Sequence, residues 1–369
     1  MEQSKGKIGI KEFIALTILM TGTKLADDTP AIIYEELQNA GWIAPLIVGA
    51  LSIIPIALLI RVVTSYQDKG LIQVIDHLFG RFIGFLIIFI LWGISFFALI
   101  IDTAIYTDII GTMYYSRTPT IAIYALLMAV CAYGGKKGFE QIGSISWAVL
   151  PYIKVSVLIA LVLSFFQGQT SYLFPILGPG EWEVIKESSL KLSIFGDFIF
   201  IFILVPFIKS TKDFNRGVWI SLCIIVAEVT LAMMIYVVMF DYQSVMMLNY
   251  PYHELIRTVQ LGFLTNMETF FFPFWLIASF VRFTVYMYIA AMLFGRLFKI
   301  KEFEYAIPAL ATLVVFVGSI PESPTQSIFE IRARLIDVST PIYIILPLLI
   351  WIVAKFKGDL KHDKAKESI

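Results

Sequence analysis

The recurrence of apolar runs of about 20 residues constrains the fold of this chain more than any other feature of its sequence. A helix of that length crosses roughly 30 Å of hydrocarbon. Of the 369 residues, 59% are hydrophobic and only 15% are charged, and the mean hydropathy is +0.83. These values are typical of a polytopic membrane protein and exclude a soluble globular domain. We therefore expect an all-α integral membrane protein in which residues 1–369 form a single polytopic membrane domain.

The positions of the apolar runs predict ten transmembrane helices. Helices 1–5 occupy about residues 8–166, helices 6–10 about residues 188–356, and a charged tail follows at 357–369. The expected apolar spans are residues 13–37, 42–63, 82–110, 120–133, 142–166, 192–208, 217–240, 269–294, 305–320 and 341–356. Residues 70–81 are expected to lie along the membrane interface, and residues 167–191 and 241–266 to form long polar connections.

Lysines and arginines concentrate on alternate connections between these spans. Of the 28 such residues, 19 fall on one side of the predicted membrane and six on the other. Cytoplasmic loops carry an excess of lysine and arginine, so both termini are expected to be cytoplasmic. Arg332 and Arg334 are among the six residues assigned to the outer side.

Two of the predicted spans are interrupted. In the first span, the stretch from Thr21 to Pro30 places a glycine, three charged side chains and a proline between two apolar pieces. In the sixth span, Gly196 and Asp197 interrupt the apolar run. Irregular backbone at membrane depth survives only against protein or a water-filled cavity. Discontinuous helices at the midplane are typical of substrate sites in secondary transporters.

The positions of the two interruptions predict the architecture. Ten helices divide into two halves of five, and the interruptions fall on the first helix of each half. An odd number of helices per half forces the two halves into opposite orientations in the membrane. We therefore expect a 5+5 inverted repeat in which the broken helices 1 and 6 meet at the midplane.

Three short motifs carry a resemblance to a known family. They are Thr21-Gly22-Thr23 followed by Pro30 in helix 1, Gly41-Trp42 at the start of helix 2, and Tyr172-Leu173-Phe174-Pro175-Ile176-Leu177-Gly178-Pro179-Gly180 after helix 5. With these motifs the chain resembles, over essentially its whole length, the endospore germination permease family, the B subunits of spore germinant receptors. That family lies within the amino acid–polyamine–organocation transporter superfamily. Where the commoner family pattern has a second glycine and an apolar run, this chain has Lys24 and Asp27-Asp28.

The resemblance implies a LeuT-like fold and a receptor function. A subunit of this kind would bind a small germinant, such as an amino acid, and signal to A-type and C-type subunits in the spore inner membrane. A proton- or sodium-coupled amino acid transporter remains the alternative, because fold does not fix function. In some proton-coupled members of the superfamily, a lysine in helix 5 stands where sodium-coupled relatives bind a cation. Lys154 is similar to that lysine in helix number and depth.

The expected ligand site lies between the two breaks and is completed by helices 3 and 8. Half-helix ends there expose carbonyls and N–H groups to the two poles of a ligand, and glycine allows a close backbone approach. A zwitterion fits such poles, but Asp27 and Asp28 would repel its carboxylate, so a cationic, neutral or sugar-like ligand stays open. The predicted ligand-binding residues are Thr21, Gly22, Thr23, Lys24, Asp102, Tyr106, Phe195, Gly196, Asp197 and Tyr286.

Ionisable side chains inside the spans form a second set of candidates. Each costs roughly 2.5–3.5 kcal/mol at a helix centre on insertion scales, so such side chains face the bundle interior and pair. The expected coupling or ion-pair residues are Lys154, Asp27, Asp28, Glu228 and Arg282. For Lys154 two interpretations stay open: a strut on the carbonyls of the helix 1 break, or a plain ion pair with an acidic residue of helix 3 or 7.

The sequence contains no motif that predicts catalysis. It has neither an HExxH zinc motif nor a phosphate-binding glycine-rich loop, so no enzyme activity, cofactor, metal ion or nucleic-acid partner is expected. The three histidines, His77, His253 and His362, fall in predicted connections or the tail, where we expect them to be solvated or interfacial.

Overall fold

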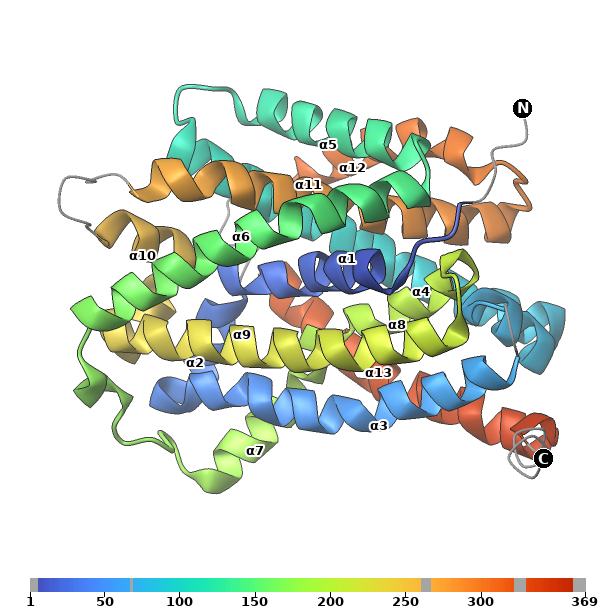
Figure 1. The fold of residues 1–369 in the computed structure, drawn as a ribbon, viewed down its shortest axis with the longest axis horizontal. Helices are drawn as coiled ribbons and strands as arrows, with labels where there is room; N and C mark the ends of the chain where they lie inside the picture. Colours follow the sequence, from blue (N-terminus) through green and yellow to red (C-terminus); the bar gives the residue numbers. More distant parts are fainter. Residues whose placement is uncertain (1–5, 67–68, 260–266, 322–329, 361–369) are drawn as a thin grey trace.

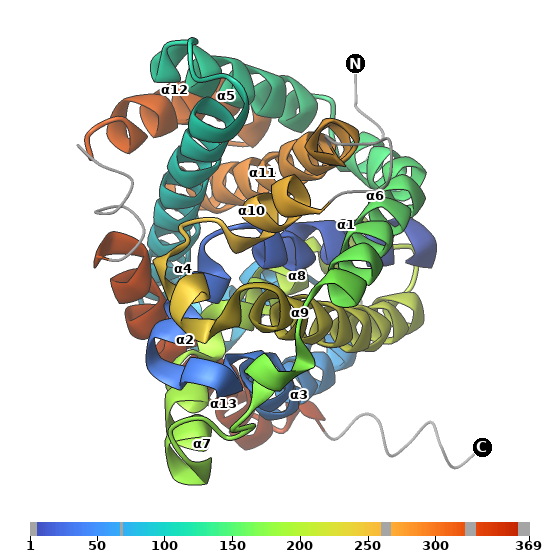
Figure 2. The same ribbon diagram turned by 90° about the vertical axis from the view of Figure 1, so that its left-hand side faces the viewer.

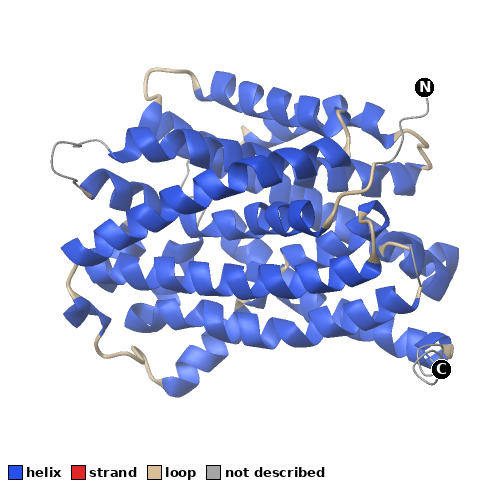
Figure 3. Ribbon diagram, in the orientation of Figure 1, coloured by secondary structure: helices blue, strands red, loops and turns tan. Residues whose placement is uncertain are grey.

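The computed structural model describes residues 6–66, 69–259, 267–321 and 330–360, and these residues form a bundle of helices that run along its long axis (Figures 1 and 3). Within these ranges, six helices are long and apolar enough to cross a membrane, or seven if one bent pair counts as a single span. The expectation of an all-α multi-pass membrane protein is confirmed. The count of ten spans stays a prediction, because α1, α5 and α12 are shorter than a full span.

The helices follow one another with few long connections. In chain order they are α1 (Ile10–Gly22), α2 (Thr29–Leu37), α3 (Ala44–Ser65), α4 (Leu71–Ile109), α5 (Thr120–Lys136), α6 (Phe139–Gln167), α7 (Glu181–Leu190), α8 (Asp197–Ile201), α9 (Thr211–Met247), α10 (Pro251–Thr258), α11 (Met267–Phe298), α12 (Ile307–Gly318) and α13 (Ala333–Phe356). Short 3₁₀ turns lie between several of them, among which η1 (Thr23–Ala26), η5 (Leu192–Phe195) and η6 (Phe202–Phe207) belong to the broken helices.

The predicted break in helix 1 is present. The α-helix α1 ends at Gly22, the chain tightens into the 3₁₀ turn η1, and Asp27 is extended, with φ −99° and ψ −156°. The second half, α2, begins at Thr29 and has Pro30 in its first turn, where the missing N–H costs nothing. The carboxylate of Asp27 accepts a hydrogen bond from the backbone N–H of Thr29 at 2.9 Å, which satisfies one of the free N–H groups at the start of this second half.

The break in helix 6 extends further than the sequence predicted. The helix α7 and the segment Leu192–Phe207 meet at a bend of 50° and together form one broken element. The prediction that residues 167–191 are only a polar connection is therefore wrong for Glu181–Leu190. The helix α7 was not predicted because it is not an apolar run. Its exposed face carries charged residues, Glu181, Glu183 and Lys186.

The helix α1 lies inside the bundle, packed against α6, α9 and α11 (Figure 2). A single parallel bridge between Ile8 and Ile208 joins the segment before α1 to the end of the helix 6 element. The N–H of Ile8 donates to the carbonyl of Phe207 at 2.9 Å, and the N–H of Lys209 donates to the carbonyl of Ile8 at 3.0 Å. The first helices of the two predicted halves are thus tied together at one end of the molecule.

Candidate functional site

Seven charged side chains are buried around the break in helix 1. Among the described residues they are the lysines, arginines, aspartates and glutamates that are less than a tenth exposed: Lys24, Asp27, Asp28, Asp102, Asp197, Arg282 and Arg332. We call them the central charge cluster. Burying a charge is expensive unless it is paired and hydrogen-bonded, so the contacts within the cluster hold its helices together.

Asp102 of α4 is the acidic centre of the cluster. Its two carboxylate oxygens form separate ion pairs, one with Arg282 of α11 and the other with Arg332, which directly precedes α13. Arg282 also donates to the hydroxyl of Thr23 at 2.8 Å. Asp102 and its two arginines therefore connect four elements: η1, α4, α11 and the start of α13.

Arg332 joins the cluster to the second half of helix 1. Its Nη2 donates to Asp27 at 2.9 Å and to the hydroxyl of Thr29 at 3.0 Å, and its Nε lies 3.2 Å from Asp28. The planar guanidinium suits this bridging of several carboxylates. The assignment of Arg332 to an outer connection is wrong, because the residue is only 4% exposed and lies within the central charge cluster. The sequence signal was hidden by polar residues such as Asp337, which make α13 seem to begin at Pro341 rather than at Ala333.

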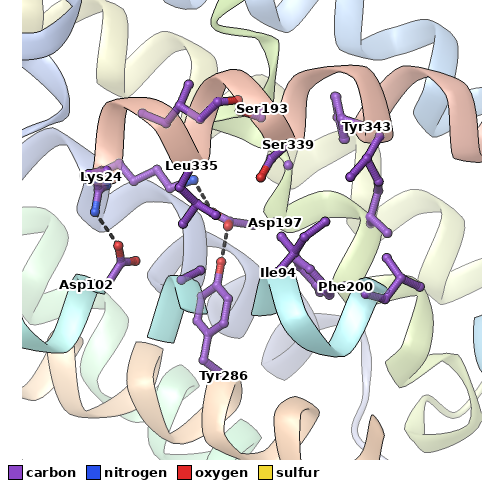
Figure 4. A pocket seen from close by; sticks show the side chains of 17 residues that line it. Lys24, Ile94, Asp102, Ser193, Asp197, Phe200, Tyr286, Leu335, Ser339 and Tyr343 are labelled. Atoms are coloured by element: carbon purple, nitrogen blue, oxygen red, sulfur yellow. Dashed lines mark hydrogen bonds and ion pairs between the residues drawn. The ribbon is translucent and has the colours of Figure 1, made fainter. Parts of the chain in front are cut away.

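The two helix breaks meet through Lys24 and Asp197. The amino group of Lys24 donates to the carbonyl of Ile194 at 2.5 Å and lies 2.8 Å from Oδ2 of Asp197. The other oxygen of Asp197 accepts a hydrogen bond from the hydroxyl of Tyr286 on α11 (Figure 4). A movement of either break therefore alters the contacts of the other break and of α11.

A cavity of about 80 Å³ adjoins these groups. Charged and polar side chains, Lys24, Asp102, Asp197 and Tyr286, gather at one end of it, and Ile94, Phe200 and Tyr343 lie toward the other end (Figure 4). Arg332 also lines the cavity. A volume of this size holds several water molecules at about 10–15 Å³ each, or one small solute.

The structure distributes the predicted ligand-binding residues over two sides of helix 1. Lys24, Asp102, Gly196, Asp197 and Tyr286 line the cavity described above, which we call the main cavity. The remaining five predicted residues lie in its surroundings or in a second cavity.

Gly22 and Thr23 line a second cavity, of about 30 Å³, beside α6, α9 and α11. The hydroxyl of Tyr106 donates to the carbonyl of Thr23 at 3.2 Å and holds the break from its α4 side. Phe195 is fully buried next to Gly196, and the buried hydroxyl of Thr21 has no hydrogen-bond partner within the described part of the chain.

Lys154 of α6 forms an ion pair with Glu228 of α9, and both residues line the second cavity. The amino group donates to both carboxylate oxygens. A Cβ atom built on Gly22 would lie 3.6 Å from Oε2 of Glu228, so the pair abuts the end of α1. Of the two interpretations offered for Lys154, the structure shows the ion pair with an acidic residue of the seventh predicted span, which corresponds to α9.

His253 of α10 lies over the break from the other side. Its side chain is fully buried, with Nδ1 2.9 Å from the hydroxyl of Tyr114 and the ring edge-on to Trp275 at 4.6 Å. Burial lowers the pKa of His253 to about 3, because the charged imidazolium would lose its hydration. The expectation of a solvated or interfacial histidine is wrong here. His77 is about half-exposed, and His362 lies outside the described residues.

Comparisons with known proteins agree with this architecture. A family model described as "Spore germination protein" matches residues 12–327. The spore germination protein YndE of Bacillus subtilis (strain 168) is 21% identical over 333 residues, covering 89% of this chain and 91% of YndE. The spore germination protein KB of the same organism is 23% identical over 372 residues, covering 98% of both chains.

A solved structure confirms the expected fold. The crystal structure of MhsT in complex with L-phenylalanine matches with a TM-score of 0.69 at 13% identity, covering 93% of this chain and 88% of MhsT. At that identity the likeness shows the LeuT-like fold alone. Because the family model covers well over half of the chain, this protein belongs to the spore germination permease family.

Proposed function

We propose that this protein is the B-type subunit of a germinant receptor. It binds a small germinant, such as an amino acid, and passes a conformational signal to A-type and C-type subunits in the inner membrane of the spore. The observation that carries the proposal is the main cavity, which lies where the breaks of helices 1 and 6 meet at Lys24 and Asp197. The germination functions named for YndE and KB support it.

The ion pair and the hydrogen bond of Asp197 at the cavity wall link ligand binding to the contacts between helices. Asp197 is held by Lys24 from helix 1 and by Tyr286 from α11, so a ligand that competes for Asp197 alters the contact between three helices. A ligand shifts a conformational equilibrium only through differential contacts with the two states. The Lys24–Asp197 and Tyr286–Asp197 contacts are the groups able to supply that difference.

A second candidate is a proton- or sodium-coupled amino acid transporter. The observation that favours it is the titratable Lys154–Glu228 pair beside the second cavity, close to the end of α1. The two functions are separated by reconstitution into liposomes. Accumulation of a radiolabelled amino acid against a proton or sodium gradient identifies a transporter, whereas ligand binding without accumulation supports the receptor.

The proposal is tested by filling the main cavity. A Cβ atom at Gly196 would lie 2.8 Å from the carbonyl oxygen of Ser193, and Gly196 lines the cavity, so Gly196→Leu both distorts the break and occupies the site. Gly93 of α4 has nothing within 4 Å of such an atom, so Gly93→Leu is the matched control.

The measurement is the germination rate of spores in response to the germinant that triggers the wild type, divided by the amount of protein in the membrane. We expect Gly196→Leu to lose the response and Gly93→Leu to retain it. A normal response per molecule in Gly196→Leu would place the ligand site elsewhere.

A further inference from the structure

The charges of the central charge cluster do not balance. Among the described residues it contains four aspartates, Asp27, Asp28, Asp102 and Asp197, but only three basic side chains, Lys24, Arg282 and Arg332. Fully ionised, the cluster has a net charge of −1. Because the cost of an uncompensated buried charge is large, one further positive charge is needed, and either a bound ligand or a proton supplies it.

A carboxylate in the wall of the main cavity shows where a ligand would meet this charge. Asp197 is buried and lines the cavity. Its Oδ2 lies 2.8 Å from the amino group of Lys24, which also donates to the carbonyl of Ile194. Each carboxylate oxygen has two lone pairs, so Asp197 can accept a further hydrogen bond from a donor in the cavity.

The rest of the cavity wall suits the body of an organic cation. Asp102 faces the same end as Asp197, and a carboxylate has lone pairs for more than the two arginines that it already pairs with. The ring of Tyr286 lies at this charged end, and an aromatic ring attracts a cation over its face. Ile94, Phe200 and Tyr343 lie toward the other end and suit the apolar part of the ligand (Figure 4).

A ligand carboxylate finds no free cation among the described residues of this wall. Lys24 is engaged by Asp197 and by the carbonyl of Ile194, and Arg332 by three carboxylates. A zwitterion adds no net charge and leaves the cluster at −1, and an anion makes the imbalance worse.

We propose that the main cavity binds a small organic monocation, a primary ammonium on a short apolar body without a free carboxylate, with its ammonium between Asp102 and Asp197. The inference rests on the proposed function, because it concerns the same cavity, and it replaces the amino acid given there as an example with an amine that has no free carboxylate. Of the cationic, neutral and sugar-like ligands left open by the sequence, it selects the cation.

Three compounds that share an isopropyl group test the charge selection. Isobutylamine is L-valine without the carboxylate, and isovalerate is L-valine without the ammonium. At pH 7 the amine is protonated, since alkylammonium groups have pKa values near 10. Binding of each compound is measured by titration calorimetry with the purified full-length protein in lipid nanodiscs.

We expect isobutylamine to bind about tenfold or more tightly than L-valine, a difference of about 1.4 kcal/mol, and isovalerate to bind most weakly. Equal or tighter binding of L-valine or isovalerate would overturn the inference, and so would failure of isobutylamine to bind.

The variant Asp28→Asn tests whether the charge of the cluster makes this selection. Asp28 belongs to the cluster but does not line the main cavity, and its ion pair is with Nε of Arg332 at 3.2 Å. The amide is isosteric and removes one negative charge. We expect the preference for isobutylamine over L-valine to fall about tenfold, whereas Asp337→Asn, at an aspartate 55% exposed, leaves it unchanged.

An unchanged preference in Asp28→Asn would mean that a proton already neutralises the cluster, and the inference would then be wrong. Failure of the inference is distinguishable from failure of the proposed function by a wider panel of amino acids, sugars and nucleosides. If a neutral solute binds and Gly196→Leu abolishes its binding, the cavity is a ligand site and only the charge class is wrong. If no compound of the panel binds, both proposals fail.

Discussion

Among the described residues, Arg332 is the single side chain that forms ion pairs with Asp27, Asp28 and Asp102 together. Replacing it by glutamine would leave these buried carboxylates without their shared partner. Breaking a buried ion pair on one side costs about 3–5 kcal/mol, so we expect Arg332→Gln to lower the unfolding temperature of the purified protein markedly. Arg334→Gln is the control, because Arg334 is exposed and its replacement should change stability by no more than about 0.5 kcal/mol. Equal unfolding temperatures for the two variants would contradict this role of Arg332.

The Lys154–Glu228 pair is expected to respond differently to single and double replacement. Lys154→Ala leaves the carboxylate of Glu228, whose side chain is 12% exposed, without its cation. We expect a loss of about 1–3 kcal/mol in thermal unfolding, and recovery of part of it when Glu228→Gln is added. If the double variant is as unstable as Lys154→Ala, the charge pair is not the cause of the loss.

The same variant separates a structural from a signalling role of Lys154. Because the pair abuts the end of α1 at Gly22, we expect the ligand response per molecule in the membrane to fall more in Lys154→Ala than the amount of protein does. Lys154→Arg should not restore the response fully, since the guanidinium geometry differs from that of an ammonium. An unchanged response per molecule in Lys154→Ala would assign Lys154 a structural role alone.

Single residues were predictable from the sequence where a charge interrupts an apolar run. Lys24, Asp102 and Arg282 stand out for that reason, because a charge inside a span needs a buried partner. Arg332 could not be found in this way, since it lies in a polar stretch that reads as a connection. The identity of each partner, such as Glu228 for Lys154, depends on how helices far apart in the chain pack together, which the sequence pattern does not contain.

At the scale of an element, α10 acts as a buried cover over the break in helix 1, with His253 as its pH-sensitive residue. The pKa of His253, about 3 when buried, lies below the ordinary value of 6.5, so the folded state favours the neutral imidazole. The stability from this burial is fully present above pH 6.5 and is lost as the pH falls toward 3, by up to about 1.4 kcal/mol per pH unit. We expect hydrogen exchange of α10 to accelerate in acid relative to the rest of the bundle.

The variant His253→Gln isolates this effect from the titration of nearby groups such as Glu254 and Arg257. Glutamine does not titrate, so the acceleration between pH 6.5 and 5 should be smaller in the variant than in the wild type. His77→Gln, at a half-exposed histidine, should leave the pH dependence of α10 unchanged. The same acceleration in all three proteins would mean that another group controls α10.

A helix or a helix break could be predicted from the sequence where apolar and polar residues are clearly separated along the chain. The break in helix 1 was expected because charges, glycine and proline fall inside an apolar run, and the structure has it between Gly22 and Thr29. The helix α7 was missed because a short helix with several glutamates on its surface has the composition of a loop. Its role as one half of a broken element follows from the 50° bend, which is a property of the packed structure.

At the scale of the whole molecule, the inverted repeat is predicted from the odd number of helices in each half of the chain. It placed breaks on the first helix of each half, and the structure brings the two breaks together through Lys24 and Asp197. The bridge between Ile8 and Ile208 also joins the start of helix 1 to the end of helix 6, as expected when the two halves have opposite orientations. The number of ten spans needs evidence that helix lengths alone do not supply, because α12 has only 12 residues.

The orientation of the molecule in the membrane tests that number. The excess of lysines and arginines on alternate connections predicts cytoplasmic termini, and both termini lie on the same side as the bridge at Ile8 and Ile208 when four spans follow helix 6, as the ten-span prediction has it. A reporter fused after Phe356 and another inserted after Lys209 should therefore be cytoplasmic, whereas one inserted near Gly180 should lie outside. If the reporters after Phe356 and Lys209 lie on opposite sides, the second half of the chain has an odd number of spans after helix 6, and the 5+5 division is wrong.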